Sequence, residues 1–154
     1  MLIRDVMSTR FATIHPDATL REAAAAFQAE PDHGGVPNLL VMEGDRLLGL
    51  VTLTDVLRVL LPPSIAQDPR LAHLAWDGLI EAQYQRVREK RIRDIMTRHV
   101  VTIDESAVLA EAAEHLVTGR IHALPVLRGG TVVGVLSLAD LAMRIFARVG
   151  GQPE

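Results

Sequence analysis

The sequence predicts an α+β fold, in which two β-α-β-β-α repeats are joined by a helical linker. Three observations predict it: an internal duplication, the same order of strand-like and helix-like segments in each copy, and a stretch between the copies that belongs to neither. The chain has 154 residues, of which 49% are hydrophobic and 23% charged. This is enough apolar surface to bury one compact unit or two small halves that share an interface.

The duplication is the main signal. Residues 3–27 and 92–116 are identical at 11 of 25 aligned positions, beginning with Ile-Arg-Asp-Val-Met and Ile-Arg-Asp-Ile-Met. A second block, 36–60 against 121–145, has 6 identities in 25 and mostly exchanges Val, Ile and Leu elsewhere. We therefore assign residues 1–61 to the first repeat, 62–91 to a linker, 92–149 to the second repeat and 150–154 to a tail.

Local patterns predict the same elements in both repeats. In the first, an extended segment at 11–14 precedes an amphipathic helix, which Thr19 and Glu22 can open as a capping box. Strands at 38–42 and 47–51 follow, joined by a turn-forming Glu-Gly-Asp-Arg, and a second helix begins near residue 54. The second repeat gives the corresponding extended segments and helices: 100–103, a helix beyond Ser106, 124–127, 132–136 and a helix from Ala139.

The linker carries its own helical pattern. Asp68 can cap a helix that has Pro69 in its first turn. The apolar face expected for this helix consists of Leu71, Leu74, Ala75, Gly78, Leu79 and Ala82. We expect the helix to pack on the repeats or on a partner.

Two segments, GLVTLTD at 49–55 and GVLSLAD at 134–140, resemble the strand-to-helix signature of CBS (cystathionine-beta-synthase-type) domains. The Ile-Arg-Asp openings, the sequence at 122–126 and the duplication support this resemblance, which leaves only the linker outside it. It implies a stand-alone tandem pair related by pseudo-two-fold symmetry and packed through its sheets, with up to two clefts between the repeats and dimerisation into a disc. It also implies regulation by an adenosine-containing ligand such as AMP, ADP, ATP or S-adenosylmethionine.

The signature has a physical rationale of its own. Its glycine lets backbone approach a ligand, and a hydroxyl at the start of a helix, beside unpaired amides and the positive end of the dipole, favours phosphate. Thr52 and Ser137 are the phosphate candidates, and Asp55 and Asp140 can accept hydrogen bonds from ribose hydroxyls, a role that matches the family. The alternative is that both pairs are capping boxes that need no ligand.

Further candidates surround these two junctions. Adenine would lie between aliphatic side chains of the extended segments and the entrances of the opposing strands. These residues are Thr13, Ile14, Val36 and Pro37 in the first repeat, and Thr102, Ile103, Ala123, Leu124 and Pro125 in the second. For Ile14, Ile103 and Leu124, plain core packing is the favoured alternative. Arg120 and His122 can place donors near phosphate, so we expect the site at Ser137 and Asp140 to be the stronger.

Composition excludes several other functions. A net charge of −3 disfavours binding to nucleic acid, and the basic residues between 86 and 93 are better explained as a solvated helix end. There is no cysteine, the six histidines lack metal-ligand spacing, and no apolar run approaches the roughly 18 residues of a membrane span. We therefore expect a cytoplasmic protein with no metal and no membrane insertion.

These patterns predict a regulatory module rather than an enzyme. No nucleophile, general base or metal site converges with the signature residues. The module would need no cofactor, would bind an adenine nucleotide as regulatory ligand, would form a homodimer and would control a separate protein. The alternative is a ligand-free scaffold for oligomerisation or protein interaction.

Overall fold

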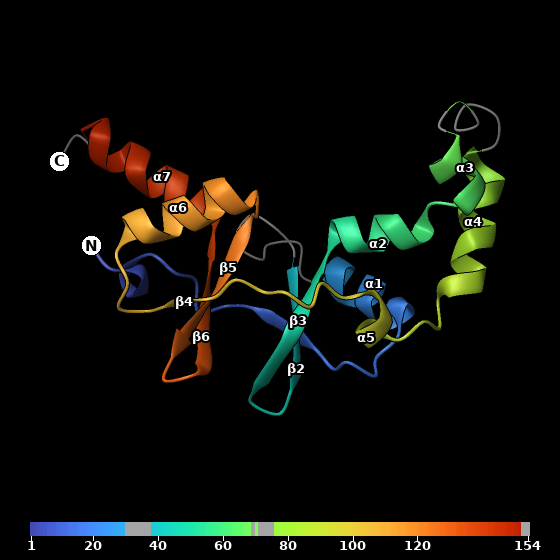
Figure 1. The fold of residues 1–154 in the computed structure, drawn as a ribbon, viewed down its shortest axis with the longest axis horizontal. Helices are drawn as coiled ribbons and strands as arrows, with labels where there is room; N and C mark the ends of the chain where they lie inside the picture. The colour runs from blue at the N-terminus through green and yellow to red at the C-terminus, as the bar shows by residue number, and fades with distance from the viewer. Residues whose placement is uncertain (30–37, 69, 71–75, 152–154) are drawn as a thin grey trace.

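The computed structural model describes residues 1–29, 38–68, 70 and 76–151, which form two lobes with the same order of elements (Figure 1). The first lobe contains β1 (Ala12–Ile14), α1 (Leu20–Ala29), β2 (Asn38–Glu43), β3 (Arg46–Thr52) and α2 (Leu53–Leu60). The second lobe contains β4 (Ile103–Asp104), α6 (Leu109–Gly119), β5 (Ala123–Arg128), β6 (Thr131–Ser137) and α7 (Leu138–Val149). The predicted α+β class and the repeated element order are confirmed.

Each lobe is built on a three-stranded sheet, in the orders β1-β2-β3 and β4-β5-β6. The first strand of each sheet runs parallel to the second, and the second pairs antiparallel with the third. Both hairpins have a register shift at the same repeat position, after Val41 and after Val126. The helices pack against their sheets over buried aliphatic side chains, so each lobe has its own hydrophobic core.

The opening segments of the two repeats are exchanged between the lobes. Residues 3–8, the N-terminal arm, pack on the second lobe, where Ile3 is fully buried and Ser8 pairs with Val135 through two backbone hydrogen bonds of 2.9 Å. Residues 92–97, the central arm, contain the short helix α5 (Ile92–Ile95) and pack on the first lobe. Figure 1 shows this exchange, with α5 beside α1. Sequence repeats and packing units therefore do not coincide.

The glycine of each strand-to-helix signature makes room for an arm. A Cβ atom at Gly49 would lie 2.6 Å from the carbonyl oxygen of Thr97, and one at Gly134 would lie 2.7 Å from that of Ser8. Neither distance is compatible with a side chain. The interpretation of these glycines as points of ligand approach is therefore wrong: they admit the backbone of the arm.

The linker packs on the first lobe and differs from the predicted helix. It contains α3 (Pro63–Gln67), which the sequence did not indicate, and α4 (Trp76–Val87), while residues 69 and 71–75 of the predicted helix lie outside the described residues. The Asp68 carboxylate accepts from the backbone amide of Arg70 at 3.2 Å and also pairs with its guanidinium, while the first turns of the helix that Asp68 was predicted to cap lie outside the described residues. The predicted face is also wrong: Gly78, Leu79 and Ala82 are exposed. The inward positions, which offer larger apolar or amphipathic side chains, are Ile80, Gln83, Tyr84 and Val87.

Candidate functional site

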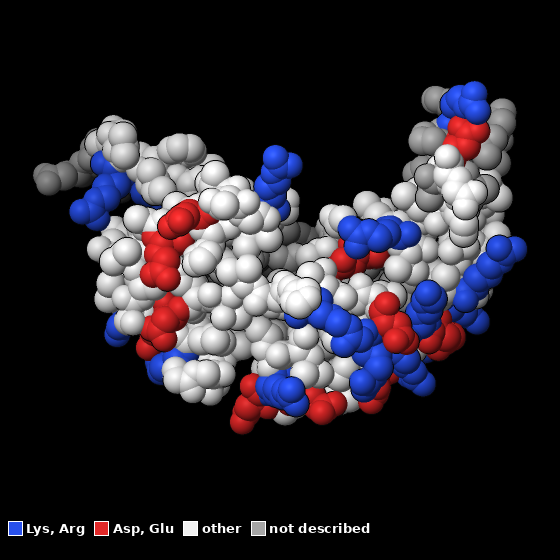
Figure 2. Space-filling model, viewed as in Figure 1, with Lys and Arg blue, Asp and Glu red and all other residues white. Residues whose placement is uncertain are grey.

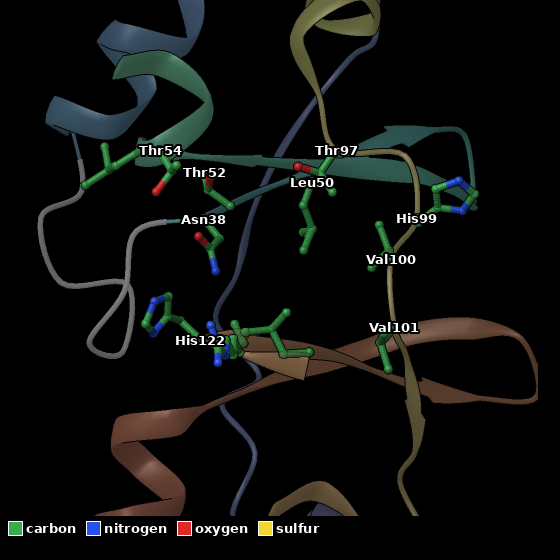
Figure 3. Close-up of a pocket in the computed structure, with 13 residues that line it drawn as sticks. Asn38, Leu50, Thr52, Thr54, Thr97, His99, Val100, Val101 and His122 are labelled. Carbon is green, nitrogen blue, oxygen red and sulfur yellow. The ribbon is translucent and has the colours of Figure 1, made fainter. Parts of the chain in front are cut away.

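A cleft of about 290 Å³ lies between the two lobes (Figure 3). Its first-lobe wall consists of the start of β2, the end of β3 and the start of α2. The chain that leaves the central arm closes one side, and the loop between α6 and β5 closes the other. The lining residues are Asn38, Leu50, Thr52, Leu53, Thr54, Thr97, His99, Val100, Val101, Arg120, Ile121, His122 and Ala123.

Asn38 is the most deeply placed polar side chain of this wall. It is the first residue of β2, it lies opposite Thr52 in the sheet register, and it is only 8% exposed. Figure 3 shows its amide pointing into the space between the lobes, toward the side from which His122 projects. Its side chain forms no hydrogen bond with any other described residue. A buried amide without a partner costs free energy, so this group is suited to a ligand.

Asp55 lies behind the cleft wall rather than in it. Its buried carboxylate accepts from the Thr52 amide at 3.0 Å and the Thr52 hydroxyl at 3.1 Å, and the Thr97 hydroxyl lies 3.1 Å from each of its oxygens. Arg58 adds a contact of 3.3 Å. The Asp55 amide in turn donates to Thr52 Oγ1 at 3.2 Å. The capping-box interpretation is therefore confirmed here, and the network fixes two hydroxyls that line the cleft.

Aliphatic side chains supply the rest of the cavity surface. Leu50 projects from β3, and Val100 and Val101 follow the central arm (Figure 3). Sequence reasoning did not place these two valines in a site, because consecutive valines are typical of a buried strand. They line the cleft because Thr97, at the end of the central arm, forms two backbone hydrogen bonds with Leu50, of 2.8 and 3.0 Å. The next residues must then cross between the lobes.

Two nitrogen-bearing side chains lie on the second-lobe side of the cleft, and a third, that of His99, lies at the opposite end, beside the first lobe (Figure 3). Arg120 and His122 belong to the loop between α6 and β5, and His99 lies on the crossing segment, residues 97–101, which leads from the first lobe to the second. All three are exposed. Arg120 adopts the left-handed conformation, with φ 51° and ψ 42°, at the C-terminal end of α6. The sequence paired Arg120 and His122 with Ser137 and Asp140, and this is wrong: their side chains line the cleft on the Thr52 junction.

The second junction has a different environment. Ser137 is buried, and its hydroxyl accepts from the Asp140 amide at 3.0 Å, so it caps α7. The backbone carbonyl of His122 accepts from the Leu138 amide at 2.7 Å. Asp140 is half-buried and borders an open depression together with Val6, Met143, Arg144 and Ala147.

The structure thus brings together only part of the predicted site. Thr52, Arg120, His122 and Ala123 line the cleft, whereas Ile103 and Leu124 are buried in the second core, as their alternative interpretation stated. Thr102 lines a separate hollow between the hairpin tips, with Arg46 and Arg98. The remaining positions line neither space. Thr13 is exposed on β1, Ile14 packs against the first core and Pro125 is buried in β5. Val36 and Pro37 lie outside the described residues.

Several charges elsewhere are paired. Arg93 binds Asp17 and lowers the pKa of that carboxyl, and Arg21 binds Glu89 at 3.3 Å. Figure 2 shows basic and acidic side chains interleaved over this face of the first lobe, without a continuous basic patch. Within the described residues, no three metal-ligating side chains converge. No described helix combines the length and apolar character that crossing a membrane requires.

Comparison with known proteins agrees with this architecture. The CBS-domain protein YhcV of Bacillus subtilis is 25% identical over 142 residues, which cover 92% of this chain and 83% of YhcV. The solved CBS domain pair of MJ0100, in complex with 5′-methylthioadenosine and S-adenosylmethionine, has a TM-score of 0.68 at 21% identity, covering 96% of this chain and 98% of the other. CBSX2 in complex with AMP has a TM-score of 0.69 at 20% identity, with the same coverage. The CBS domain family matches residues 3–62 and 92–147, so this chain belongs to that family.

Proposed function

We propose that the cleft binds an adenosine-containing ligand and that its occupancy regulates a separate partner. The observation that carries the proposal is the buried side-chain amide of Asn38, which has no hydrogen-bond partner among the described residues and points into a cavity that both lobes build. Solved CBS pairs in complex with AMP and with S-adenosylmethionine support the ligand class. A site lined by aliphatic walls and a few convergent polar groups is typical of small-molecule recognition.

The cleft offers a distinct chemistry for each part of such a ligand. Leu50, Val100 and Val101 can cover the faces of a base, and the Asn38 amide can both donate to and accept from its edge. Hydroxyls of Thr54 and Thr97 lie on the first-lobe side for the sugar, while Arg120 and His122 lie on the second-lobe side. The ribose role of Asp55 requires its carboxylate to exchange Thr97 for the ligand, and it stays a prediction.

Regulation follows from where the cleft lies. The crossing segment 97–101 is fixed to the first lobe by Thr97 and continues into β4 of the second. A ligand that contacts both this segment and residues 120–123 therefore favours one relative position of the lobes over others. A partner that recognises either position would respond to ligand concentration.

Calorimetric titration of nucleotide-stripped protein with AMP, ADP, ATP and S-adenosylmethionine tests the proposal. We expect saturable binding with one of them, and at least ~10-fold weaker binding by Asn38→Leu, because a lost hydrogen bond in a buried site costs about 1–3 kcal/mol. Asn38→Leu should keep or raise the unfolding midpoint, since it removes an unpaired buried amide. Asp140→Ala, at the other junction, is the matched control and should bind normally.

An absence of heat and of thermal shift with all four compounds would contradict the proposal and favour the scaffold function.

A specific observation supports self-association in either case: apolar side chains are exposed along the second helix of each repeat. These are Leu53, Leu57 and Leu61 at α2, and Met143, Phe146 and Val149 on α7. We propose that a second copy covers these faces. Light scattering of the protein and of Phe146→Glu tests this, and a monomeric parent protein would contradict it.

A further inference from the structure

The hollow between the hairpin tips is a second space that both lobes build. The turns of the β2–β3 and β5–β6 hairpins lie on the side of the molecule away from α2 and α7 (Figure 1). The cavity there, the hairpin-tip hollow, has a volume of about 310 Å³. It shares one lining residue, Val100, with the cleft, so the crossing segment lies between the two spaces. The lining residues of the hollow are Arg46, Leu47, Leu48, Arg98, Val100, Thr102, Leu127 and Gly130.

Two arginines give the hollow a positive charge. Arg46 begins β3 of the first lobe, and Arg98 lies on the crossing segment. The described lining residues include no aspartate or glutamate, and the nearby Glu43 and Asp45 of the β2–β3 turn do not line the hollow. We propose that the hairpin-tip hollow is a binding site for a phosphate-type oxyanion, separate from the cleft, and that the guanidinium groups of Arg46 and Arg98 hold the anion.

The internal duplication shows that the fold does not require these two arginines. When the repeats are aligned, Thr131 occupies the position of Arg46 in the second repeat, and Thr9 occupies the position of Arg98 in the first. Both repeats nevertheless form the same hairpin with the same register shift. Two like charges beside one cavity repel each other, and an anion bound between them removes that cost. The pair of arginines is therefore better explained by a ligand than by the hairpin.

The side chain of Arg98 is held in place before a ligand binds. Its Nη2 donates to the backbone carbonyl of Arg93 at 2.7 Å. This bond orders the side chain and leaves the other N–H groups of the guanidinium able to donate, which lowers the entropy cost of binding. A planar guanidinium can donate two parallel hydrogen bonds to one phosphate group.

The backbone around the hollow adds donors and room. The amides of residues 98–102 form no hydrogen bond with any described residue, so they are available to a ligand. A Cβ atom added at Gly130, where φ is 84°, would meet no atom within 4 Å. Leu48 is the extra residue at the register shift of the first hairpin, so both it and Leu47 line the hollow. Arginine side chains beside available amides are typical of phosphate recognition.

Calorimetric titration with inorganic pyrophosphate, in a buffer free of phosphate, tests the inference. The titration uses full-length Arg120→Gln protein, which lacks the arginine of the cleft, so that the remaining binding is assigned to the hollow. We expect saturable binding and a raised unfolding midpoint. Adding Arg46→Gln or Arg98→Gln should weaken binding at least ~10-fold, because charge-assisted hydrogen bonds contribute at least that factor. Adding Arg148→Gln, in the last turn of α7, removes the same charge and should change nothing.

A substitution at Gly130 tests the charge of the hollow without touching either arginine. Gly130→Asp introduces a carboxylate, as Asp45 does at the matched turn position of the first repeat, and should weaken pyrophosphate binding at least ~10-fold. Gly130→Asn is the matched control, because asparagine has the same size and also tolerates positive φ. It should bind pyrophosphate as the Arg120→Gln protein does.

Inorganic phosphate and ribose 5-phosphate, titrated in the same way, separate a free anion from a phosphate ester. Tighter binding of either one supports the inference and identifies which form the hollow prefers. An absence of heat and of thermal shift with pyrophosphate, or undiminished binding after both added arginine substitutions, would overturn it. AMP should bind to Arg46→Gln as tightly as to the parent protein, so a failure of this inference is distinguishable from a failure of the proposed function.

Discussion

The two strand-to-helix junctions share a sequence signature but differ in what their aspartates do. At the first, Asp55 is buried and accepts from Thr52 and from Thr97 of the central arm. At the second, Asp140 is half-buried, and within the described residues its carboxylate accepts no hydrogen bond. Ser8, the repeat counterpart of Thr97, bonds locally to the backbone of Arg10 instead.

This difference shows that the hydrogen bonds of the signature aspartate depend on the arm that packs against it. Both aspartates lie in the first turn of a helix opened by a hydroxyl, and both arms pass a glycine. Only the central arm presents a hydroxyl to the aspartate, so only the first junction has a closed polar network. The cleft of about 290 Å³ lies beside that junction.

The largest expected effect tests what the junctions have in common. Gly49→Ala and Gly134→Ala should each lower the free energy of unfolding by about 3 kcal/mol, because the added methyl group collides with arm backbone that cannot move without breaking its pairing. The two losses should be similar. Urea denaturation measures both.

Gly78→Ala is the matched control for these two substitutions. Gly78 lies in α4 with no atom within 4 Å of the added Cβ, so alanine should stabilise by about 1 kcal/mol through helix propensity. A small loss at Gly49 or Gly134 would show that the arm is not held as tightly as its backbone hydrogen bonds indicate.

The next effect tests the difference between the junctions. Asp55→Asn should cost about 2 kcal/mol, because an amide has one acceptor oxygen where the buried carboxylate uses two. Asp140→Asn should cost less than ~0.5 kcal/mol, since its carboxylate bonds to no described residue. Unfolding in urea gives both values, and equal losses would contradict the comparison.

The smallest effect concerns an ion pair that only the second lobe contains. Arg128 donates to Glu105 at 2.6 and 2.9 Å and lowers the pKa of that carboxyl, whereas Pro16 occupies the matching position of the first lobe. Because the pKa of Glu105 is lower in the folded than in the unfolded chain, its stabilisation is complete above about pH 4.3 and is lost as pH falls through the folded value.

Glu105→Gln should therefore destabilise the protein at pH 7, and its difference from the parent protein should shrink toward zero as the pH falls to about 3. The urea midpoint measured across this range checks the trend. Glu114→Gln, on the exposed face of α6, is the control and should show no such trend. A difference that is constant with pH would show that the pair acts through packing alone.

Sequence periodicity predicted the elements well, because it reports which faces are apolar and where helices are capped. Thr19 and Glu22 form the expected capping box, with bonds of 3.0 and 3.2 Å, and Ser137 caps α7. Helix α4 shows the limit of the method. Small residues fit either face of a helix, so the pattern that included Gly78 and Ala82 did not identify the face that packs on the first lobe.

The exchange of arms could not be predicted from the sequence. Both repeats open with Ile-Arg-Asp, so the sequence pattern is the same whether each arm packs on its own lobe or on the other. The cleft depends on this exchange, because the central arm carries Thr97 and leads to Val100 and Val101. Of the residues predicted from local chemistry, Thr52, Arg120, His122 and Ala123 line the cleft, while residues placed there by long-range packing, such as Asn38, were not predicted.

The exchange has a consequence for the ancestry of the fold. Neither repeat fills its own core in this structure, because the segment that fills it is supplied by the other repeat. Two unfused copies would have to trade these segments and would form an intertwined dimer, which duplication and fusion of the gene could turn into one chain without rearranging either lobe. Selection could then alter the halves independently, and the loss of the hydroxyl network at one junction is the kind of divergence that such freedom permits.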